Sequence, residues 1–332
     1  MAKAENYMVI NSETGQSEDI MGKYMYYSLP KLFVKADKVK EICEKLNFPI
    51  RPRENISKTD AFKSATGDIR DRIEEKVDDK LKIRKIYCRD NIRIESDVIS
   101  RELVEETLYE KTNSYKKLAN ITLDKATGKM VLSDVEFSSG VDVYRYFNEA
   151  ERLFELYQDC IGNSGIETMA SKYVSSLHAL NISARGYHYF VPKAYMQRIS
   201  LLEDFMELIS SENLFEYKNK RDAKYISINS MYVVDDDKQR KKMAHEFYQS
   251  MGAEIEEYQR RIEKLIRNGN SSQAILDRWE LKIRALEHKK REYETILKQN
   301  LSGMDENFMM LRSMCDQFKY NVRASSLAGL AA

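Results

Sequence analysis

The chain has 332 residues, with 54 Lys+Arg against 53 Asp+Glu, a hydrophobic share of 42%, and only 12 Gly and 4 Pro. A formal net charge of +1 with this hydrophobic share excludes two classes, the intrinsically disordered chain and the strongly basic, histone-like protein. The low content of glycine and proline, which both weaken helices, favours long helices.

The cysteines are spread along the whole chain, at Cys43, Cys88, Cys160 and Cys315. Because no two of them have the spacing of a metal-ligand pair or a redox motif, they indicate reduced, buried thiols. The first residues lack the apolar core of a signal peptide, and no stretch has the roughly 20 apolar residues that cross a bilayer. These features predict a cytoplasmic protein, in the host cytoplasm if the source is viral, with no membrane association.

Residues 1–140 are expected to form a mixed α/β domain. The clearest local pattern is Asn120–Leu132, where two alternating runs flank a Gly-containing turn, as in a β-hairpin. Helical spacing of apolar residues predicts a short helix over Val39–Leu46, and a Ser or Thr cap opens another near Thr59. Further strands are expected at 24–27, 32–34 and 82–87, and 103–109 is compatible with a strand or a helix.

Residues 141–234 are expected to form a helical domain with short strands. Apolar residues recur every three or four positions in 143–161, 166–177 and 196–209, which predicts three amphipathic helices. The first of these is expected to stop at Gly162–Gly165. Strands are expected at 185–192, ended by Pro192, and at 225–229.

The strongest pattern lies in residues 235–302. Apolar side chains recur at helical spacing from Met243 to Leu265 and from Ile275 to Leu297, on either side of the polar stop Asn268–Ser272. A short link between two long helices predicts an antiparallel coiled-coil hairpin. Residues 303–332 are expected to form a helix, over Phe308–Phe318, and a mobile tail. The predicted fold class is thus α+β, a mixed α/β N-terminal head followed by a mainly helical region with this hairpin.

The sequence contains no motif that names a reaction. It has neither a Gly-x-x-x-x-Gly-Lys-Ser/Thr phosphate loop, nor His-Glu-x-x-His, nor paired zinc-binding cysteines. The histidines are isolated, and His245 and His288 fall in charged helices, where we expect them at the surface. The acidic triplet Asp235–Asp237 is interpreted as the cap and first turn of a helix, with Mg²⁺ coordination as the alternative. We therefore predict no catalytic residue, no metal ligand and no cofactor, and a non-enzymatic role is favoured.

Charge is the one feature that indicates a function. Between Lys31 and Arg93 the chain has 18 Lys+Arg against 12 Asp+Glu, a local excess of +6. Such a cluster with aromatic residues nearby suits phosphate contacts and stacking on unpaired bases, although a solvated basic face is the simpler explanation. A second candidate is the strand at 185–192. The residues predicted to contact nucleic acid are Arg51, Arg53, Lys58, Lys63, Lys82, Arg84, Lys85, Arg89, Arg185, Tyr187 and His188.

The helical hairpin is the candidate surface for a partner. Lys and Arg alternate with Glu between its apolar positions, so its exposed faces are balanced in charge. The apolar seam is expected to make the chain a homo-oligomer or to bind another protein. The residues predicted for this contact are Met243, Phe247, Met251, Trp279 and Ile283.

Three segments together carry a resemblance: the run Arg51–Phe62, the segment Arg185–Pro192 and the long helical C-terminal end. Over most of its length the chain resembles a poorly characterised family scattered among bacteria, archaea and their viruses and mobile elements. This resemblance implies a protein carried by a virus or mobile element, and it brings no catalytic residues. At the level of fold alone, a mixed head with a helical hairpin is similar to Nop-type scaffold proteins that hold guide RNAs, although no Nop signature motif is present.

Three hypotheses follow from the sequence. The first is a non-enzymatic nucleic-acid-binding scaffold of a phage or mobile element, with RNA favoured, which uses the basic region and docks or dimerises through the hairpin. The second is a phage-encoded adaptor, an anti-defence or host-takeover factor that binds a host protein. The third is a metal-dependent nuclease with dispersed carboxylates such as Asp235 and Asp237.

Overall fold

The computed structural model describes residues 20–53, 56–77, 80–90, 97–108, 113–183, 186–215 and 225–330. The chain divides into two compact units, each built from segments that are far apart in sequence. The first unit combines the residues up to Ser28 with Ala170–Met206 and the residues from Ile226 onward, and the second combines Leu29–Met169 with Glu207–Tyr225. The predicted domain boundaries at residues 140, 234 and 302 divide the chain into consecutive segments. The two units are not consecutive, because strand pairing joins the N-terminal segment to much later residues.

The first unit contains a four-stranded antiparallel sheet of order β11-β1-β10-β9. Its strands are β1 (Ile20–Ser28), β9 (Leu180–Asn181), β10 (Tyr187–Pro192) and β11 (Ser227–Val234). Central β1 aligns Tyr24 with Phe190 on β10 and with Met231 on β11. His188 and Phe190 are two residues apart on β10 and share a face of the sheet, and burial increases along the strand from the exposed His188 to the buried Phe190. The strands predicted at 24–27, 185–192 and 225–229 are thereby confirmed, with ends that differ by a few residues.

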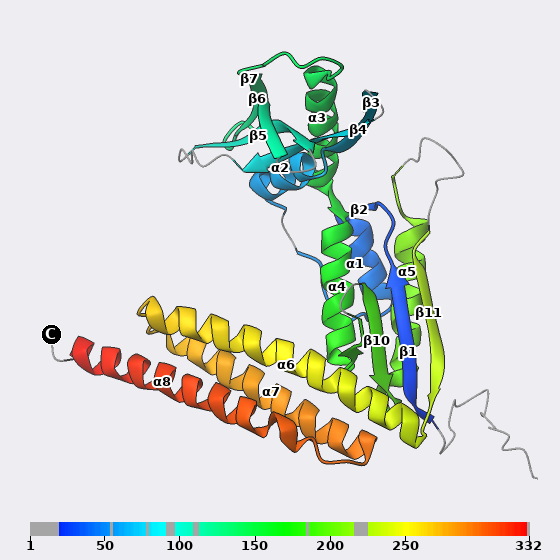
Figure 1. Cartoon of the computed structure of the whole chain (residues 1–332), viewed down its shortest axis with the longest axis vertical. Helices are drawn as coiled ribbons and strands as arrows, with labels where there is room; N and C mark the ends of the chain where they lie inside the picture. Colours follow the sequence, from blue (N-terminus) through cyan, green and yellow to red (C-terminus); the bar gives the residue numbers. More distant parts are fainter. Residues whose placement is uncertain are drawn as a thin grey trace, which may run out of the picture. The chain divides into compact units, whose positions relative to one another are not determined.

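Two predicted helices lie beside this sheet (Figure 1). They are α4 (Asn163–Ser176) and α5 (Ile199–Ser211), and the 3-10 helix η1 (Lys193–Arg198) leads into α5. The hydroxyl of Tyr173 on α4 donates to the carbonyl oxygen of Arg198 at 2.9 Å, which ties α4 to η1. The division between the two units falls inside α4 and inside α5.

Three long helices complete the first unit and run side by side in Figure 1. They are α6 (Asp237–Arg267), α7 (Gln273–Leu297) and α8 (Asp305–Leu330), and the 3-10 helix η3 (Ser302–Met304) precedes α8. One apolar cluster joins them, with Phe247 from α6, Tyr293 from α7 and Phe318 from α8 fully buried. The predicted hairpin of α6 and α7 is present, but α8 packs against its apolar seam and makes a three-helix bundle. Helix α8 is also longer than the predicted segment 308–318.

The second unit contains a five-stranded antiparallel sheet in which neighbours in sequence are neighbours in space. Its strands are β3 (Arg70–Val77), β4 (Lys80–Asp90), β5 (Val98–Leu108), β6 (Asn113–Asp124) and β7 (Met130–Ser133). The predicted hairpin is β6 and β7, and its turn contains Gly128 in the left-handed region, with φ 78°. The segment 103–109, for which sequence allowed two structures, belongs to strand β5 over its described residues.

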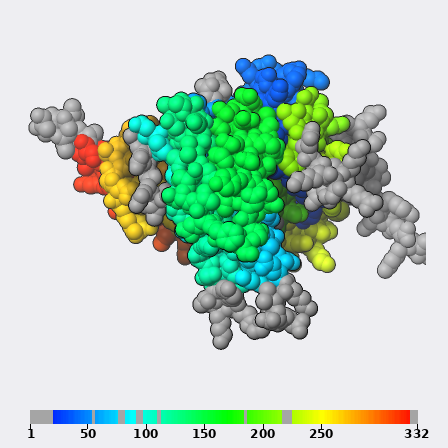
Figure 2. Space-filling model, turned by 90° about the horizontal axis from the view of Figure 1, so that it is seen from above, coloured from blue at the N-terminus to red at the C-terminus, as the bar shows by residue number. Residues whose placement is uncertain are grey.

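Two helices, α2 (Lys58–Gly67) and α3 (Val143–Asp159), cover one face of this sheet. Ser57 caps α2 through a hydrogen bond from the backbone N–H of Asp60, at 3.0 Å, as the sequence predicts. The core between helices and sheet includes Phe62 from α2, Leu103 from β5 and Phe154 from α3. In the space-filling view, the green atoms of α3 pack directly against the blue-green atoms of the sheet (Figure 2).

A short antiparallel ladder and one helix complete the second unit. The ladder joins β2 (Phe33–Lys35) to β8 (Cys160–Gly162), and α1 (Ala36–Lys45) follows β2 directly. Helix α3 therefore ends before Gly162, as predicted, but the chain continues as a strand and not as a loop. Buried apolar residues of α1, Val39 and Ile42 among them, confirm the predicted helix.

The architecture confirms the α+β class. Within the described ranges, no helix is both long and apolar enough to cross a membrane. All four cysteines are free and buried, as predicted, and burial raises the pKa of the Cys88 thiol to about 12.

Phe318→Ala should lower the free energy of unfolding of the first unit by about 3–5 kcal/mol, because it leaves a cavity in the bundle core. Tyr320→Ala is the matched control on the same helix. Tyr320 is 72% exposed, so its loss should change the stability by no more than about 0.5 kcal/mol. Denaturant unfolding followed by circular dichroism measures both, and equal small losses would contradict the packing of α8.

Candidate functional site

The residues predicted to contact nucleic acid in the second unit lie on different sides of its sheet. Along β4 the side chains of Arg84, Ile86 and Cys88 are buried toward the helices, so Lys85 and Arg89 point to the opposite, outer face. Lys82 is two residues from Arg84 on β4 and therefore lies on the same face of the sheet as Arg84. Arg51, Arg53, Lys58 and Lys63 lie on or just before α2, on the helical side of the sheet.

Arg84 belongs to a buried polar network. Its Nε donates to Glu105 at 2.6 Å, one terminal nitrogen donates to Glu75 at 2.7 Å, and the other donates to the carbonyl oxygen of Ser139 at 2.8 Å. The hydroxyl of Ser138 donates to the second oxygen of Glu105 at 2.6 Å. Because each guanidinium nitrogen of Arg84 donates to another group of the protein, we do not include Arg84 in the proposed ligand-binding surface.

Charges in this network stabilise each other. Burial raises the pKa of Glu105, but hydrogen bonds from Arg84 and Ser138 and the charges of Arg84 and Lys116 outweigh it, so the net pKa is lowered. The hydrogen bond to Glu105 is the main cause that raises the pKa of Arg84. Both groups are thus charged in the folded protein at neutral pH.

Several other predicted cations already have partners. Arg89 donates to Glu102 at 2.9 Å, and Lys58 donates to the carbonyl oxygen of Ala126 at 2.8 Å. Arg53 lies 3.5 Å from Asp60 and remains largely exposed. In the part of the chain that the structure describes, Lys85 has no carboxylate within ion-pairing distance.

A groove lies along β3 and β4, and it is lined both by outer-face residues such as Lys85 and Tyr87 and by residues of the helix-covered face such as Ile86 and Cys88. Cross-strand register places Arg70 beside Tyr87 and Arg72 beside Lys85. The groove has a volume of about 530 Å³, and four cations line it against two carboxylates. Its charged lining residues are Arg70, Arg72, Lys85, Arg101, Asp71 and Glu106. This arrangement brings Lys85 together with arginines that the sequence did not single out.

The two carboxylates of the groove are engaged by other groups. Asp71 accepts a hydrogen bond from Tyr146 at 2.8 Å and pairs with Arg145 at 2.6 Å. The hydrogen bond from Tyr146 is the main reason why the pKa of Asp71 is lowered, with smaller contributions from the N–H of Arg72 and from Arg145 against an opposing effect of burial. Glu106 accepts from Asn113 and Tyr115 at 2.9 and 3.0 Å. Two of the groove's cations have partners as well, since Arg72 pairs with Glu74 at 2.7 Å and Arg101 pairs with Asp90 at 3.1 Å. The lining still has four cations against two carboxylates.

The predicted residues of β10 belong to the first unit. Tyr187 stacks on Tyr27 with ring centroids 4.6 Å apart, and His188 stacks on Tyr26 at 5.7 Å. The exposed pair of Tyr26 and His188 offers an aromatic edge to solvent. Arg185 lies outside the described residues.

The five residues predicted for partner binding all lie inside the first unit. Met243, Phe247, Met251, Trp279 and Ile283 are at most 7% exposed and belong to the apolar cluster that α8 completes. A partner could reach these side chains only if α8 left the bundle. Their partner role therefore stays a prediction.

The acidic triplet is the start of α6, as predicted. Asp236 is the N-cap, and its side chain accepts a hydrogen bond from the N–H of Gln239 at 2.8 Å. Asp235 pairs with Arg240 and with Lys298, and Asp237 also pairs with Arg240. Two cations, Arg240 and Lys298, thus compensate the charge of these carboxylates.

A second candidate site lies in the first unit, where tertiary structure brings His178, His288 and Glu292 together. His288 and Glu292 are one turn apart on α7, and His178 follows α4. One ligand atom from each residue lies within 4.8 Å of those of the other two. Glu292 shares a hydrogen bond with Nδ1 of His178, and the hydroxyl of Tyr195 lies 3.4 Å from the same nitrogen.

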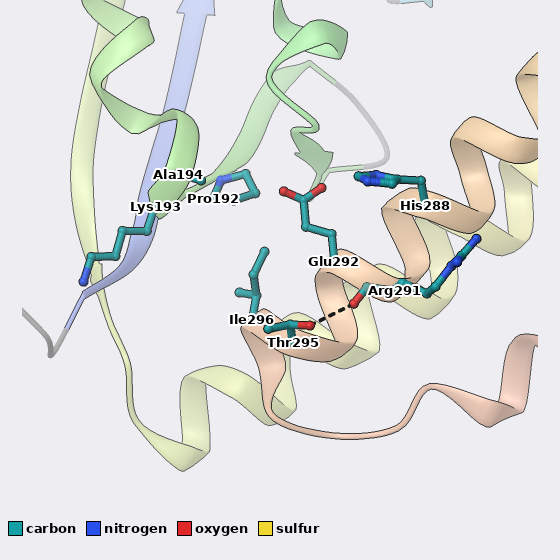
Figure 3. A pocket seen from close by; sticks show the side chains of 8 residues that line it. All are labelled: Pro192, Lys193, Ala194, His288, Arg291, Glu292, Thr295 and Ile296. Atoms are coloured by element: carbon teal, nitrogen blue, oxygen red, sulfur yellow. Dashed lines mark hydrogen bonds between the residues drawn. The ribbon is translucent and has the colours of Figure 1, made fainter.

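His288 and Glu292 also line a cavity of about 750 Å³ beside the end of β10. Figure 3 shows the imidazole of His288 and the carboxylate of Glu292 pointing toward each other, whereas the side chains of Lys193 and Arg291 point away from them. The two donors therefore face a space that a small ligand could enter.

The turn that carries His178 is fixed to α7 by two hydrogen bonds. The hydroxyl of Tyr293 donates to the carbonyl oxygen of His178 at 2.9 Å, and Lys289 donates to the carbonyl oxygen of Ala179 at 2.8 Å. Burial lowers the pKa of Lys289, against the opposing charges of Glu254 and Glu292. Helix α7 thus supplies two candidate metal ligands and the two groups that hold the third in place.

The sequence could not reveal this cluster, because His178 and Glu292 are 114 residues apart. One local signal did exist. His288 and Glu292 stand four residues apart on a helix, so their side chains share a face. The backbone of His178 adopts the left-handed conformation with φ 52°, which is common for glycine and uncommon for other residues, but this is visible only in the structure.

The family of the chain is known. The chain belongs to DUF6744, a family of unknown function. The model of that family matches residues 20–326. No curated protein matches the chain, and no solved structure matches it. Membership agrees with the resemblance to a poorly characterised family, and it assigns no role to the groove or to the histidine cluster.

Arg84→Met in this DUF6744 chain should lower the free energy of unfolding of the second unit by about 3–5 kcal/mol, because it leaves the charge of Glu105 buried without its partner. Arg89→Met is the matched control on the same strand. Arg89 pairs with Glu102 while 48% exposed, so its loss should cost about 0–1 kcal/mol. Urea denaturation monitored by circular dichroism compares the two variants. A cost for Arg84→Met no larger than that of the control would show that the network does not stabilise the sheet.

The same network predicts a pH dependence. The pKa of Glu105 is lower in the folded protein than in the unfolded chain, so its contribution to stability is complete above the unfolded value of about 4.3. That contribution is lost as the pH falls through the lowered folded value. The stability difference between wild type and Glu105→Gln should therefore shrink between pH 6 and about pH 3. A difference that stays constant in urea titrations over this range would contradict the assignment.

Proposed function

We propose that this protein binds single-stranded nucleic acid, with RNA favoured, as a non-enzymatic scaffold whose contact surface is the outer face of the five-stranded sheet. The observation that carries the proposal is the groove at β3 and β4, which Tyr87 lines together with Arg70, its cross-strand neighbour, and with Arg72 and Lys85. Cations that contact phosphates and an aromatic ring that stacks on a base are the two components of single-strand binding.

Lys85 is the residue on which the proposal depends most. It lies on the outer face between two cross-strand neighbours, Glu106 and Arg72, and Arg72 pairs with Glu74 at 2.7 Å. Within the described ranges the ammonium of Lys85 forms no ion pair, so it is the groove cation that a phosphate can contact without displacing a carboxylate.

The sheet itself favours RNA over duplex DNA. Common RNA-binding modules present aromatic side chains on an open antiparallel sheet, on which unpaired bases stack. Tyr87 and Tyr115 lie on neighbouring parts of this outer face, both within reach of Glu106, to which Tyr115 donates at 3.0 Å. A single strand has a flexible backbone, so its unpaired bases can lie along such a face. The bases of a rigid duplex are already paired and cannot stack on the tyrosines.

The biological setting that we propose is a phage or mobile element acting in the cytoplasm of its host. A scaffold of this kind holds RNA on one unit and leaves the other available for assembly, including assembly into a homo-oligomer. Because α8 covers the seam of the hairpin, an oligomer would use the exposed surface of the bundle or require α8 to move.

Replacing the two groove cations, with Arg72→Gln and Lys85→Gln combined, should weaken binding of a fluorescein-labelled oligouridine about tenfold or more, because two phosphate contacts are lost. It should also reduce the slope of log K against log salt by about 1.4, at about 0.7 per phosphate of a single strand. Fluorescence anisotropy over a range of salt concentrations measures both quantities.

The matched control is Lys40→Gln combined with Lys45→Gln, which removes the same charge from exposed positions of α1. It should keep the affinity and the salt slope of the wild type. The proposal is wrong if the wild type fails to bind at low salt, or if the groove variant binds as the control does. A wild type without RNA affinity that retains one host protein would favour the adaptor hypothesis in its place.

Tyr87→Leu should weaken oligouridine binding by about 1–3 kcal/mol without changing the salt slope, because stacking is lost while the phosphate contacts remain. Tyr144→Leu is the control, since Tyr144 is an exposed tyrosine on α3, away from the groove. The same anisotropy titration separates the two components. If Tyr87→Leu leaves the affinity unchanged, stacking at this position does not occur.

A further inference from the structure

We propose that His178, His288 and Glu292 bind a divalent transition-metal ion of the zinc class, with a coordination position left open toward the cavity beside β10. The site lies in the first unit and does not depend on nucleic-acid binding by the second. It rests on the positions of three donor groups, on the framework that holds them and on the cavity that two of them line.

The donor atoms lie close enough for one ion to join them after small side-chain rotations. One ligand atom from each residue lies within 4.8 Å of the others. With metal–ligand distances of 2.0–2.2 Å, two ligands of one zinc ion are separated by about 3.4 Å in tetrahedral geometry and by at most about 4.4 Å. Contraction by an ångström or so is within reach of χ rotations of a half-buried histidine and glutamate.

The chemistry of the donors selects the kind of metal. Two imidazoles and one carboxylate form the protein ligand set of catalytic zinc sites and of the facial triad of non-haem iron. Mg²⁺ and Ca²⁺ prefer sets made of oxygen, so this group disfavours them. Three protein ligands leave at least one position for water or a small ligand, and His288 and Glu292 direct that position to the cavity.

The framework around the donors is that of a preorganised site. His178 would be free to turn away after α4, but Tyr293 and Lys289 hold the carbonyl oxygens of His178 and Ala179 at 2.9 and 2.8 Å. The left-handed backbone at His178, with φ 52°, directs its ring toward α7, and the ring lies 5.6 Å from that of His288. Tyr195, with its hydroxyl 3.4 Å from Nδ1 of His178, is placed as an outer partner of the ligands.

The competing explanation is a structural ion pair. Glu292 and His178 are hydrogen-bonded to each other, and such a pair by itself could tie the turn to α7. That explanation gives no role to His288, which is exposed and lines the cavity. A metal site requires His288, whereas a structural pair does not, and this difference decides the experiment.

The test is calorimetric titration of Zn²⁺ into the full-length protein after treatment with a chelator. We expect one ion per chain in the wild type. His288→Ala and Glu292→Gln should each weaken binding by about 100-fold or more, since loss of an outer-shell partner alone costs 10–100-fold. Because His288 is exposed, His288→Ala removes a donor with little change in packing, and circular dichroism melts verify the fold of both variants.

His245→Ala is the matched control. His245 is an exposed histidine on α6, hydrogen-bonded to Gln249 at 3.1 Å and outside the cluster, so its loss should leave Zn²⁺ affinity unchanged. Substitution with Co²⁺ provides a second measurement, since its visible spectrum should report nitrogen and oxygen ligands in the wild type and disappear in His288→Ala. Absence of Zn²⁺ binding in the wild type would overturn the proposal, as would folded His288→Ala and Glu292→Gln proteins that bind as the wild type does.

Discussion

Burying a tyrosine hydroxyl is costly unless it finds a hydrogen-bond partner, and the bond that Tyr293 makes joins three parts of the first unit. Its hydroxyl donates to the carbonyl oxygen of His178, while its ring packs against Phe247 of α6 and Phe190 of β10. Burial raises the pKa of this phenol well above its ordinary value, so it stays protonated and remains a donor. One side chain thereby joins the bundle, the sheet and the turn after α4. Without that hydrogen bond, the buried hydroxyl would be unsatisfied and would lower the stability of the first unit.

The second unit solves a comparable problem with charge. Arg84 projects to the buried face of the sheet. Its guanidinium is accommodated there because each of its three nitrogens donates a hydrogen bond, to Glu105, to Glu75 and to the carbonyl oxygen of Ser139. A network of this kind is satisfied only when all members are present, so it specifies the pairing of β4 with β5 and the position of the segment before α3. On the outer face Arg72 and Arg89 pair with Glu74 and Glu102, and Lys85 is the cation on which the proposed function mainly rests.

The two proposals use different physical resources of the molecule. The groove offers cations without full compensation on an antiparallel sheet, which suits a polyanion with unpaired bases. The histidine cluster offers two imidazoles and one carboxylate close together, which suits a single divalent ion. Neither site contains a recognisable sequence motif, and DUF6744 is a family of unknown function.

Local patterns were sufficient to predict most elements. The period of the apolar residues predicts α3, α6 and α7, and the Gly-containing turn predicts the hairpin of β6 and β7. The acidic triplet predicts the N-terminal cap of α6, which is Asp236. These features depend on residues that are near each other in sequence. In the basic region the sequence indicated the charge but not its distribution, because strand parity sends Arg84 inward and Lys85 outward.

The sequence by itself thus determined the α+β class, the amphipathic helices and the buried, unpaired cysteines. Only the tertiary structure decided that β1 pairs with β10 and β11, that α8 covers the hairpin, and that His178 meets His288 and Glu292. The physical reason is range. Periodicity and caps are set by backbone geometry within a few residues, whereas strand pairing, helix docking and ligand clusters depend on which distant surfaces can bury each other.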